Sequence, residues 1–482
     1  MSQSLQRPSL KKITLYVVLT VVLTVVLLIG VAIVAVAASF RNNVPPTISP
    51  ETTVLTEPLT PDGKSVDYRA LFLKTQDETL GAPSQNGFRD VLNAFGPLAL
   101  DAGIAKPTPP WADFLRKQSA RQKAEYAFHC EKFGLDPTAE PAFWSRPELL
   151  DVFRLSVDAD AESPLAFLTE ETWTPEELPL VDAWIRQNAD LFALLETALD
   201  RETFAPYLFP QDELFGMFGK NNFAFKFCKN LALALKTRAL YRVATDDVDG
   251  ALDDLRLILR LGRSLLNVET NAFNENFAAL SVLRRATEAV EATLAAVREN
   301  PAAARLAAIF DETLGDFDYA AAVERGIRNE RVFEFLPFLV DVLAAGPTER
   351  AEAFLFLDWV RGDVQLLDET TVSVATRALD GDAFLSRFNL FWEAALEDDF
   401  DYKTSKFAGA LDSPSLLSPS RKARSRAWAD VVGALAGPPF QGFRGAFEET
   451  RLKATELRAA ASQAAVAQAQ PETAPTPPEA TP

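Results

Sequence analysis

An uncharged run of 28 residues, Ile13 to Phe40, constrains the chain more than any other feature of its sequence. As an α-helix it would be about 42 Å long, whereas the hydrocarbon core of a bilayer is about 30 Å thick. A helix of that length spans a membrane with tilt or with a few residues to spare. The sequence therefore predicts a transmembrane helix over residues 13–40.

The charges that flank this run predict its orientation. Three basic residues precede the run and one follows it closely: Arg7, Lys11, Lys12 and then Arg41. Because basic residues are retained on the cytoplasmic side, we expect residues 1–12 inside the cell and the bulk of the chain outside. A cleaved secretory signal is the alternative, but its apolar core is usually about 7–15 residues long. We therefore expect an uncleaved signal anchor in the cell membrane.

The composition indicates a folded, acidic domain. The chain has 48 basic and 67 acidic residues, a net charge of −19, and 48% of its residues are hydrophobic. An acidic domain repels nucleic acid and anionic lipid surfaces, so no nucleic-acid partner is expected. The hydrophobic content is sufficient for a large core.

The two ends of this outer region read as unfolded. Residues 41–61 contain five prolines among Thr and Ser, which predicts a semi-rigid spacer that holds the folded part off the membrane. Residues 459–482 end in a Pro-rich sequence without large apolar side chains, which predicts a disordered tail.

Between these ends, residues 62–458 have helical periodicity throughout. The clearest helix begins at Thr174, a good N-cap, with Pro175 at the first helical position and Glu177 completing a capping box. Its apolar residues then recur every three or four positions as far as Leu199. Similar patterns occur in 111–134, 223–244, 250–266, 273–298, 302–314, 318–345 and 349–361. We predict an all-α domain of stacked antiparallel helical hairpins.

One of these hairpins resembles a known repeat. In residues 223–266, a helix ending in Ala239-Leu240-Tyr241-Arg242 is followed by an acidic turn and by a second helix that opens at Gly250-Ala251. The predicted buried stripe of the second helix is Leu252, Leu255, Ile258, Leu259 and Leu266. The pair resembles a tetratricopeptide unit, with a spacing one residue longer and without the closing Pro. The chain as a whole resembles uncharacterised single-pass bacterial membrane proteins with Ala/Leu-rich helical outer domains, which implies fold and location.

The rarest reactive residues argue against common catalytic sites. His129 is the single histidine, which argues against nucleophilic catalysis or zinc binding that depends on histidine. We expect His129 in the core or in a groove of a helical domain. Cys130 and Cys228 are the only cysteines. Outside the cytoplasm they form either a disulfide or two buried thiols in Phe-rich surroundings. We expect no metal and no cofactor.

Two polar clusters are candidate partner-binding sites. Asn267, Asn271 and Asn274 would share one face of a helix, where paired amides bind a peptide backbone or a sugar. The alternative is that these residues cap helices and form turns. Four basic residues form the second cluster: Arg421, Lys422, Arg424 and Arg426. We expect an exposed basic turn there, able to meet an anionic envelope polymer or an acidic face of the same domain.

A third cluster has two readings. Glu324, Arg328 and Arg331 repeat at helical spacing, with Glu330 and Glu334 beside them. The favoured reading is a solvated ladder of ion pairs, and the other is a carboxylate site for glycan hydrolysis. From these patterns we expect a membrane-anchored extracytoplasmic protein that is not an enzyme and that binds or scaffolds another envelope protein or polymer. An envelope hydrolase with an Asp/Glu pair is the alternative.

Overall fold

The computed structural model describes residues 43–100, 110–144, 178–210, 223–297, 302–361, 372–397 and 413–469, apart from 374 and 419, together with 400 and 405. Most of these residues are helical, and strand-type pairing among them is confined to three isolated bridges. The predicted all-α fold class is confirmed. Among the described helices, none combines the length and the apolar character that a membrane span requires. The predicted anchor at 13–40 lies outside the described residues.

The chain divides into two compact units. Unit 1 comprises residues 1–66 and 336–438, and unit 2 comprises residues 67–335 and 439–482. The predicted helical domain therefore contributes residues to both units.

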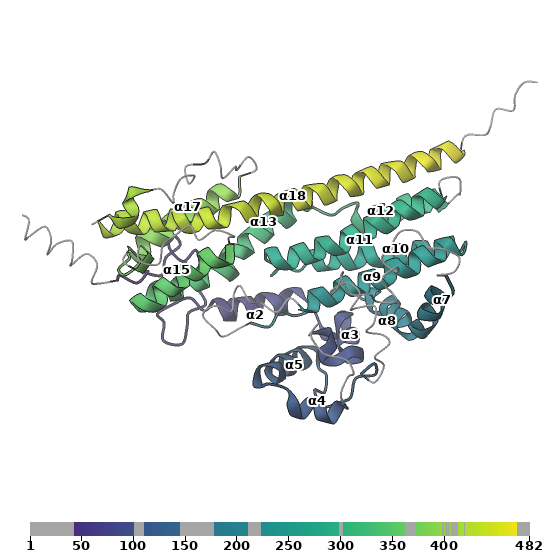
Figure 1. The fold of residues 1–482 in the computed structure, drawn as a ribbon, viewed down its shortest axis with the longest axis horizontal. Helices are drawn as coiled ribbons and strands as arrows, with labels where there is room; N and C mark the ends of the chain where they lie inside the picture. The colour runs from purple at the N-terminus through teal and green to yellow at the C-terminus, as the bar shows by residue number, and fades with distance from the viewer. Residues whose placement is uncertain are drawn as a thin grey trace, which may run out of the picture. The chain divides into compact units, whose positions relative to one another are not determined.

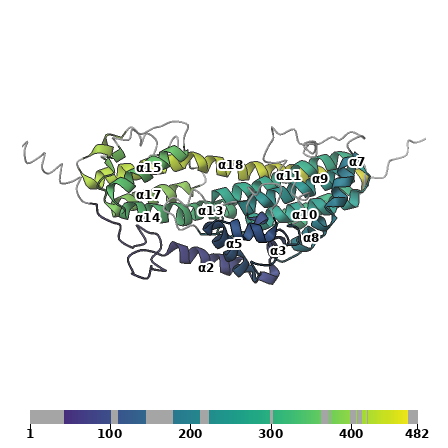
Figure 2. The same ribbon diagram turned by 60° about the horizontal axis from the view of Figure 1, so that its bottom comes forward.

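Unit 2 has three long helices at its centre, α9, α10 and α11, which lie side by side in both views (Figures 1 and 2). Its elements are α2 (Tyr68–Thr79), η1 (Pro83–Gln85), α3 (Phe88–Phe95), η2 (Gly96–Ala99), α4 (Trp111–Lys117), α5 (Ala120–Phe133), α7 (Leu178–Gln187), α8 (Ala189–Leu199), α9 (Phe223–Ala244), α10 (Val248–Leu266), α11 (Phe273–Val297), α12 (Ala302–Leu314), α13 (Tyr319–Asn329), η5 (Glu330–Phe335) and the later part of α18 (Arg421–Ala469). Gly262 lets α10 approach α11 closely, because a Cβ there would lie 2.7 Å from Leu283 Cγ.

The helix pair predicted at 223–266 is confirmed as α9 and α10. The turn between them places Asp246 at φ 64°, in the left-handed region. Asp247 then caps α10, since its side chain accepts a hydrogen bond from Gly250 N at 3.1 Å. All five residues predicted to line the second helix are buried: Leu252, Leu255, Ile258, Leu259 and Leu266.

A buried network of charges joins this hairpin to α8. Asp254 of α10 is fully buried, and Arg238 of α9 donates to it through Nε at 2.9 Å. Arg242 Nη1 donates to the second oxygen of the same carboxylate at 3.0 Å. Arg238 also donates to Glu196 of α8 at 2.8 Å, and its guanidinium lies 4.1 Å from the centre of the Phe192 ring. Each charge in the interior of the hairpin therefore has a partner of opposite sign.

Two segments predicted as single helices are each divided in two. Residues 111–134 form α4 and α5, because Ser119 and Gln122 form a reciprocal capping box that starts a new helix. The helix predicted after Thr174 is α7 and α8, which separate at Asn188, where the side-chain amide donates to Trp184 O at 2.8 Å. Thr174 itself lies outside the described residues.

The single helix predicted at 318–345 changes its type along its length. α13 leads into the π-helical turn η5, which leads into α14 (Leu336–Ala344). Pro337 lies at the second position of α14 and cannot donate a hydrogen bond to the preceding turn. The π-helical turn lies just before Pro337. Because Pro337 cannot donate the next hydrogen bond, the regular α-helical pattern is interrupted there and the chain adopts the wider turn.

The prediction that a disordered tail begins at residue 459 is wrong, because a helix continues past that position. α18 continues to Ala469, and Leu457 and Ala461 are buried on its inner face. The Ala-rich sequence of this stretch has high helix propensity, and Arg458 pairs with Asp311 of α12. Residues 470–482 lie outside the described residues.

Unit 1 contains α14, α15 (Pro347–Arg361), α17 (Gly381–Ala395), the short 3-10 turn η8 (Pro414–Leu417) and the beginning of α18. Its core is aromatic. The ring of Phe354 lies 5.9 Å from that of Phe384 and 5.5 Å from that of Trp428, measured between centroids, which joins α15, α17 and α18.

The Pro-rich segment 41–61 is not a free spacer over the part that the structure describes. Val44 N donates to Leu379 O at 2.9 Å, and Gly381 N donates to Val44 O at 2.7 Å. Farther along, Asn389 of α17 donates to the carbonyls of residues 51 and 52, each at 2.9 Å. The prediction of an extended linker is wrong for residues 43–53, because prolines leave their neighbours' carbonyls and amides free to bond with unit 1.

Candidate functional site

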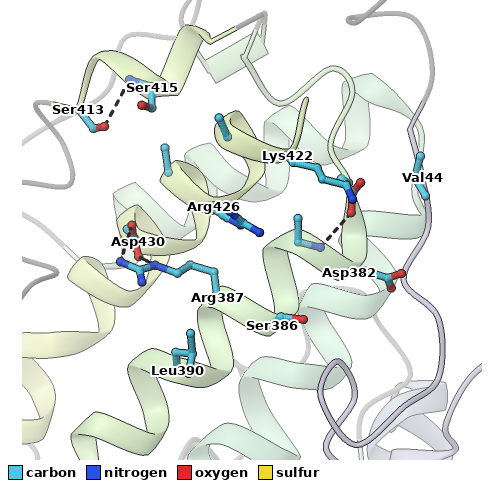
Figure 3. A pocket seen from close by; sticks show the side chains of 14 residues that line it. Val44, Asp382, Ser386, Arg387, Leu390, Ser413, Ser415, Lys422, Arg426 and Asp430 are labelled. Atoms are coloured by element: carbon cyan, nitrogen blue, oxygen red, sulfur yellow. Dashed lines mark hydrogen bonds and ion pairs between the residues drawn. The ribbon is translucent and has the colours of Figure 1, made fainter. Parts of the chain in front are cut away.

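A pocket of about 780 Å³ opens in unit 1 between α17, the first turns of α18, η8 and the segment that follows residue 43 (Figure 3). Its lining combines charge, hydroxyl groups and two apolar side chains. The charged residues are Arg387, Lys422, Arg426, Asp380, Asp382 and Asp430, the serines are Ser386, Ser413 and Ser415, and the larger apolar residues are Val44 and Leu390.

Helical spacing on two helices builds the charged walls. Asp382, Ser386 and Leu390 recur every four residues on one face of α17, and Lys422, Arg426 and Asp430 do the same on α18. Residues four apart lie one above the other on a helix. α17 starts at the pocket because Asp380 caps it, accepting a hydrogen bond from Ala383 N at 2.9 Å. Asp380 N in turn donates to Ser425 Oγ of α18 at 2.7 Å, which holds the two helices together here.

The other two acidic side chains of the pocket also have partners. Arg387 donates to Asp430 through two nitrogens, Nε to Oδ1 at 2.6 Å and Nη2 to Oδ2 at 3.2 Å (Figure 3). Asp382 Oδ1 accepts hydrogen bonds from Thr47 N at 2.6 Å and from Thr47 Oγ1 at 3.0 Å. All three carboxylates are therefore occupied in holding parts of unit 1 together.

Two basic side chains of the pocket have no such partner. Lys422 and Arg426 are exposed, and neither forms a hydrogen bond or an ion pair with another residue in the described part of the chain. Although the lining contains equal numbers of basic and acidic residues, the hydrogen-bonding groups left over are cationic donors. A guanidinium and an ammonium group one helical turn apart, with serine hydroxyls opposite, suit a phosphate or a carboxylate.

No metal centre competes with this interpretation. In the ranges that the structure describes, no three His, Cys, Asp or Glu side chains converge closely enough to hold a metal ion. The charged groups of the pocket that have no partner in the described part of the chain, Lys422 and Arg426, are hydrogen-bond donors.

The predicted basic cluster at 421–426 is divided between surface and interior. We expected an exposed turn, but α18 begins at Arg421, and only Lys422 and Arg426 line the pocket. Arg424 is fully buried and donates to Ala378 O at 2.7 Å and to Ser418 O at 2.5 Å. Arg424 is therefore unavailable to a partner, because it satisfies carbonyls of two loops.

Several residues of the pocket could not be found from the sequence. Arg387 and Asp430 lie 43 residues apart and meet only because α17 packs against α18. In the sequence, Asp382 is an ordinary acidic residue in the first turn of a helix. Its hydrogen-bond partner Thr47 lies far from it along the chain. The signal that the sequence did give is the basic cluster at 421–426, to which Lys422 and Arg426 belong.

The three asparagines of the other predicted site do not share a helix face. α10 ends at Leu266 and α11 begins at Phe273, so Asn267 is a C-cap and Asn271 lies in the connecting loop. Asn271 is fully buried and donates to Leu265 O at 2.6 Å, whereas Asn274 is exposed in the first turn of α11. The expected ladder of amides is therefore wrong, and the alternative of caps and turns describes these residues.

The ion-pair interpretation of residues 324–334 holds in part. Arg328 pairs with Glu324 at 2.5 Å on an exposed helix face, as expected. Arg331, Glu330 and Glu334 are buried in the π-helical turn instead, and Glu330 accepts a hydrogen bond from Phe273 N at 3.0 Å.

Both cysteines are buried free thiols, which confirms one of the two predicted alternatives and shows that a disulfide is wrong. Burial raises the pKa of Cys130 to about 11, and it raises the pKa of Cys228 further above the ordinary range. His129 is buried in α5, as expected, and its Nδ1 has no hydrogen-bond partner among the described residues.

The buried histidine gives unit 2 a defined response to acid. Burial lowers the pKa of His129 to about 3, so in the unfolded chain it binds a proton at a much higher pH than in the folded state. The titration of His129 therefore does not reduce the free energy of unfolding above about pH 6.5, and it reduces that free energy progressively as the pH decreases toward 3. Between pH 6.5 and 5, the free energy of unfolding of His129→Leu is expected to fall by about 1.6 kcal/mol less than that of the wild type. Denaturant unfolding across this range measures the difference, and parallel curves would contradict the assignment.

Comparisons of the chain with protein-family models, with curated proteins and with solved structures found no match.

Proposed function

We propose that this protein is a single-pass, membrane-anchored extracytoplasmic binding protein that recognises an anionic group of another envelope component in the pocket of unit 1. The observation that carries the proposal is the pair Lys422 and Arg426, exposed on a pocket of about 780 Å³ without acidic partners. Two exposed cations one helical turn apart repel each other weakly, and an anionic ligand bound between them would remove this repulsion.

The arrangement of the acidic residues favours binding over hydrolysis. A hydrolase of the kind considered above needs two carboxylates free to act on substrate, one as an acid and one as a base or nucleophile. In this pocket Asp380 holds the first turn of α17, Asp382 holds Thr47, and Asp430 is paired with Arg387. The groups with spare capacity are Lys422 and Arg426, which bind anions but do not supply that chemistry.

Charge reversal in the pocket tests the proposal. Lys422→Glu combined with Arg426→Glu is expected to reduce capture of the ligand by about 100-fold, because two charge-assisted hydrogen bonds are lost. The measurement is chemical cross-linking of the full-length protein in native membranes, followed by mass spectrometry of the retained proteins, polymers and lipids.

The matched control changes the same charges elsewhere. Lys64→Glu combined with Lys74→Glu alters two largely exposed lysines outside the pocket and should leave capture within about twofold. Equal capture by the pocket variant and the control variant would refute the proposed site.

The proposed location has its own test. A phosphatase reporter fused after Pro61 is expected to be active, since the phosphatase requires export and the charges around residues 13–40 predict an amino terminus inside the cell. An active cytoplasm-only reporter at the same position would reverse the topology.

A further inference from the structure

The pocket of unit 1 is held close to the point where the proposed anchor ends. Val44 lines the pocket, and it follows Phe40, the last residue of the apolar run, by only four positions. A fully extended chain covers at most about 3.6 Å per residue, so Val44 lies within about 14 Å of the end of that run.

The backbone fixes Val44 on unit 1. It donates to Leu379 O at 2.9 Å and accepts from Gly381 N at 2.7 Å, on either side of the residue that caps α17. Two more hydrogen bonds follow at Thr47, both to Asp382 of the pocket itself. Along the chain, the residue fixed on unit 1 therefore follows the end of the apolar run by only four positions.

The lining also has an apolar part that a purely ionic ligand would not use. Val44 is 36% exposed and Leu390 is 50% exposed, although both are large hydrophobic side chains. They lie on the same pocket as Lys422 and Arg426 (Figure 3). A site that combines unpaired cations with exposed apolar side chains matches a ligand that carries a charged group beside a hydrocarbon portion.

We propose that the pocket binds the phosphate headgroup of an anionic phospholipid from the membrane in which the chain is anchored. This inference rests on the proposed function and names the chemical class of its ligand. The phosphate oxygens accept hydrogen bonds from the guanidinium of Arg426 and the ammonium of Lys422, while the serine hydroxyls reach a glycerol headgroup. Val44 and Leu390 contact the glycerol and the first carbons of the acyl chains.

The acidic character of the whole chain does not oppose this binding. Most of the negative charge is distributed over a chain of 482 residues, and exposed charges separated by more than about 10 Å are screened at ordinary ionic strength. Within the pocket the carboxylates already have partners, so the local unpaired charge is positive.

Amine labelling in nanodiscs tests the proposal with the full-length protein. Nanodiscs of phosphatidylcholine are compared with nanodiscs that also contain phosphatidylglycerol, and a neutral acylating reagent modifies exposed lysines. Modification of Lys422, measured by peptide mass spectrometry relative to Lys64 in the same unit, is expected to be about tenfold slower with phosphatidylglycerol. Arg426→Glu, checked for native helix content, should abolish this protection, while Lys74→Glu should not alter it.

Soluble ligands added to the phosphatidylcholine nanodiscs separate the possible sources of the anion. Protection of Lys422 by phosphatidylglycerol and not by millimolar glycerol phosphate supports a lipid site. Protection by glycerol phosphate or by an acidic peptide, without protection by phosphatidylglycerol, overturns the lipid assignment but leaves an anion-binding function. Protection by none of the three overturns both proposals. Equal protection in wild type and Arg426→Glu also overturns the lipid site.

Discussion

Asp254→Ala is expected to lower the free energy of local unfolding of α9 and α10 by about 3–5 kcal/mol. The carboxylate is fully buried and accepts hydrogen bonds from Arg238 and Arg242. Arg238 is buried as well, so the substitution leaves a guanidinium in the interior with only the half-exposed Glu196 as a counter-charge. Native-state hydrogen exchange of the α9 and α10 amides in the full-length protein measures the change without requiring both units to unfold together.

The neighbouring residue provides the matched control. Asp253 is exposed, and its one ion pair within the described ranges is with Arg256, three residues along the same helix, at 3.2 Å. Asp253→Ala should change the same free energy by less than about 0.5 kcal/mol. Asp254→Asn keeps the shape of the side chain and one acceptor but not its charge, so we expect an intermediate effect. A loss in Asp254→Ala no greater than that in Asp253→Ala would show that the buried network does not stabilise the hairpin.

The apolar periodicity of this hairpin could be read from the sequence, and its charges could not. Leucines every three or four residues leave few alternatives to a buried stripe, so Leu252, Leu255 and Ile258 were placed correctly. Asp254 lies between them and looks like one more exposed acidic residue. Its burial depends on Arg238, which lies 16 residues away and becomes a neighbour only when the two helices pair.

The same limit applies to the pocket. Lys422 and Arg426 belong to a cluster of four basic residues in an acidic chain, and both line the pocket. Arg424 has the same charge and belongs to the same run, yet it is fully buried because it lies on the opposite face of α18 and satisfies carbonyls there. Charge alone identified the segment, whereas the face of the helix decided which residues a ligand can reach.

The prolines after the apolar run predict an extended spacer, and this prediction is wrong for residues 43–53. Pro45, Pro46 and Pro50 predict a chain that avoids regular structure, and residues 43–53 do avoid it. An extended chain with free backbone groups can still bond to a folded unit, however, and here it does so through Val44, with Thr52 and Thr53 buried. The consequence for function is large, because the segment expected to hold the domain away from the membrane keeps unit 1 near the end of the proposed anchor.

Gly381→Ala is expected to detach this segment, at a cost of about 1–3 kcal/mol in its local stability. A Cβ at residue 381 would lie 2.7 Å from Pro46 Cδ and 2.9 Å from the carbonyl carbon of Pro45. Proline rings and backbone atoms cannot rotate aside as a flexible side chain would. The hydrogen bond from Gly381 N to Val44 O, at 2.7 Å, would therefore be lost together with the close approach.

Limited proteolysis of the full-length protein measures the detachment, since cleavage within residues 43–53 requires the segment to leave unit 1. Cleavage should be faster in Gly381→Ala, and the same variant should lose part of the lipid-dependent protection of Lys422, because Val44 lines the pocket. Gly442→Ala is the matched control, since a Cβ there meets no atom within 4 Å and alanine favours the helix by about 0.5–1 kcal/mol. If the segment stays protected in Gly381→Ala, its attachment does not depend on this contact. The hydrogen bonds of Val44 N with Leu379 O and of Thr47 with Asp382 would then be sufficient to hold the segment on unit 1.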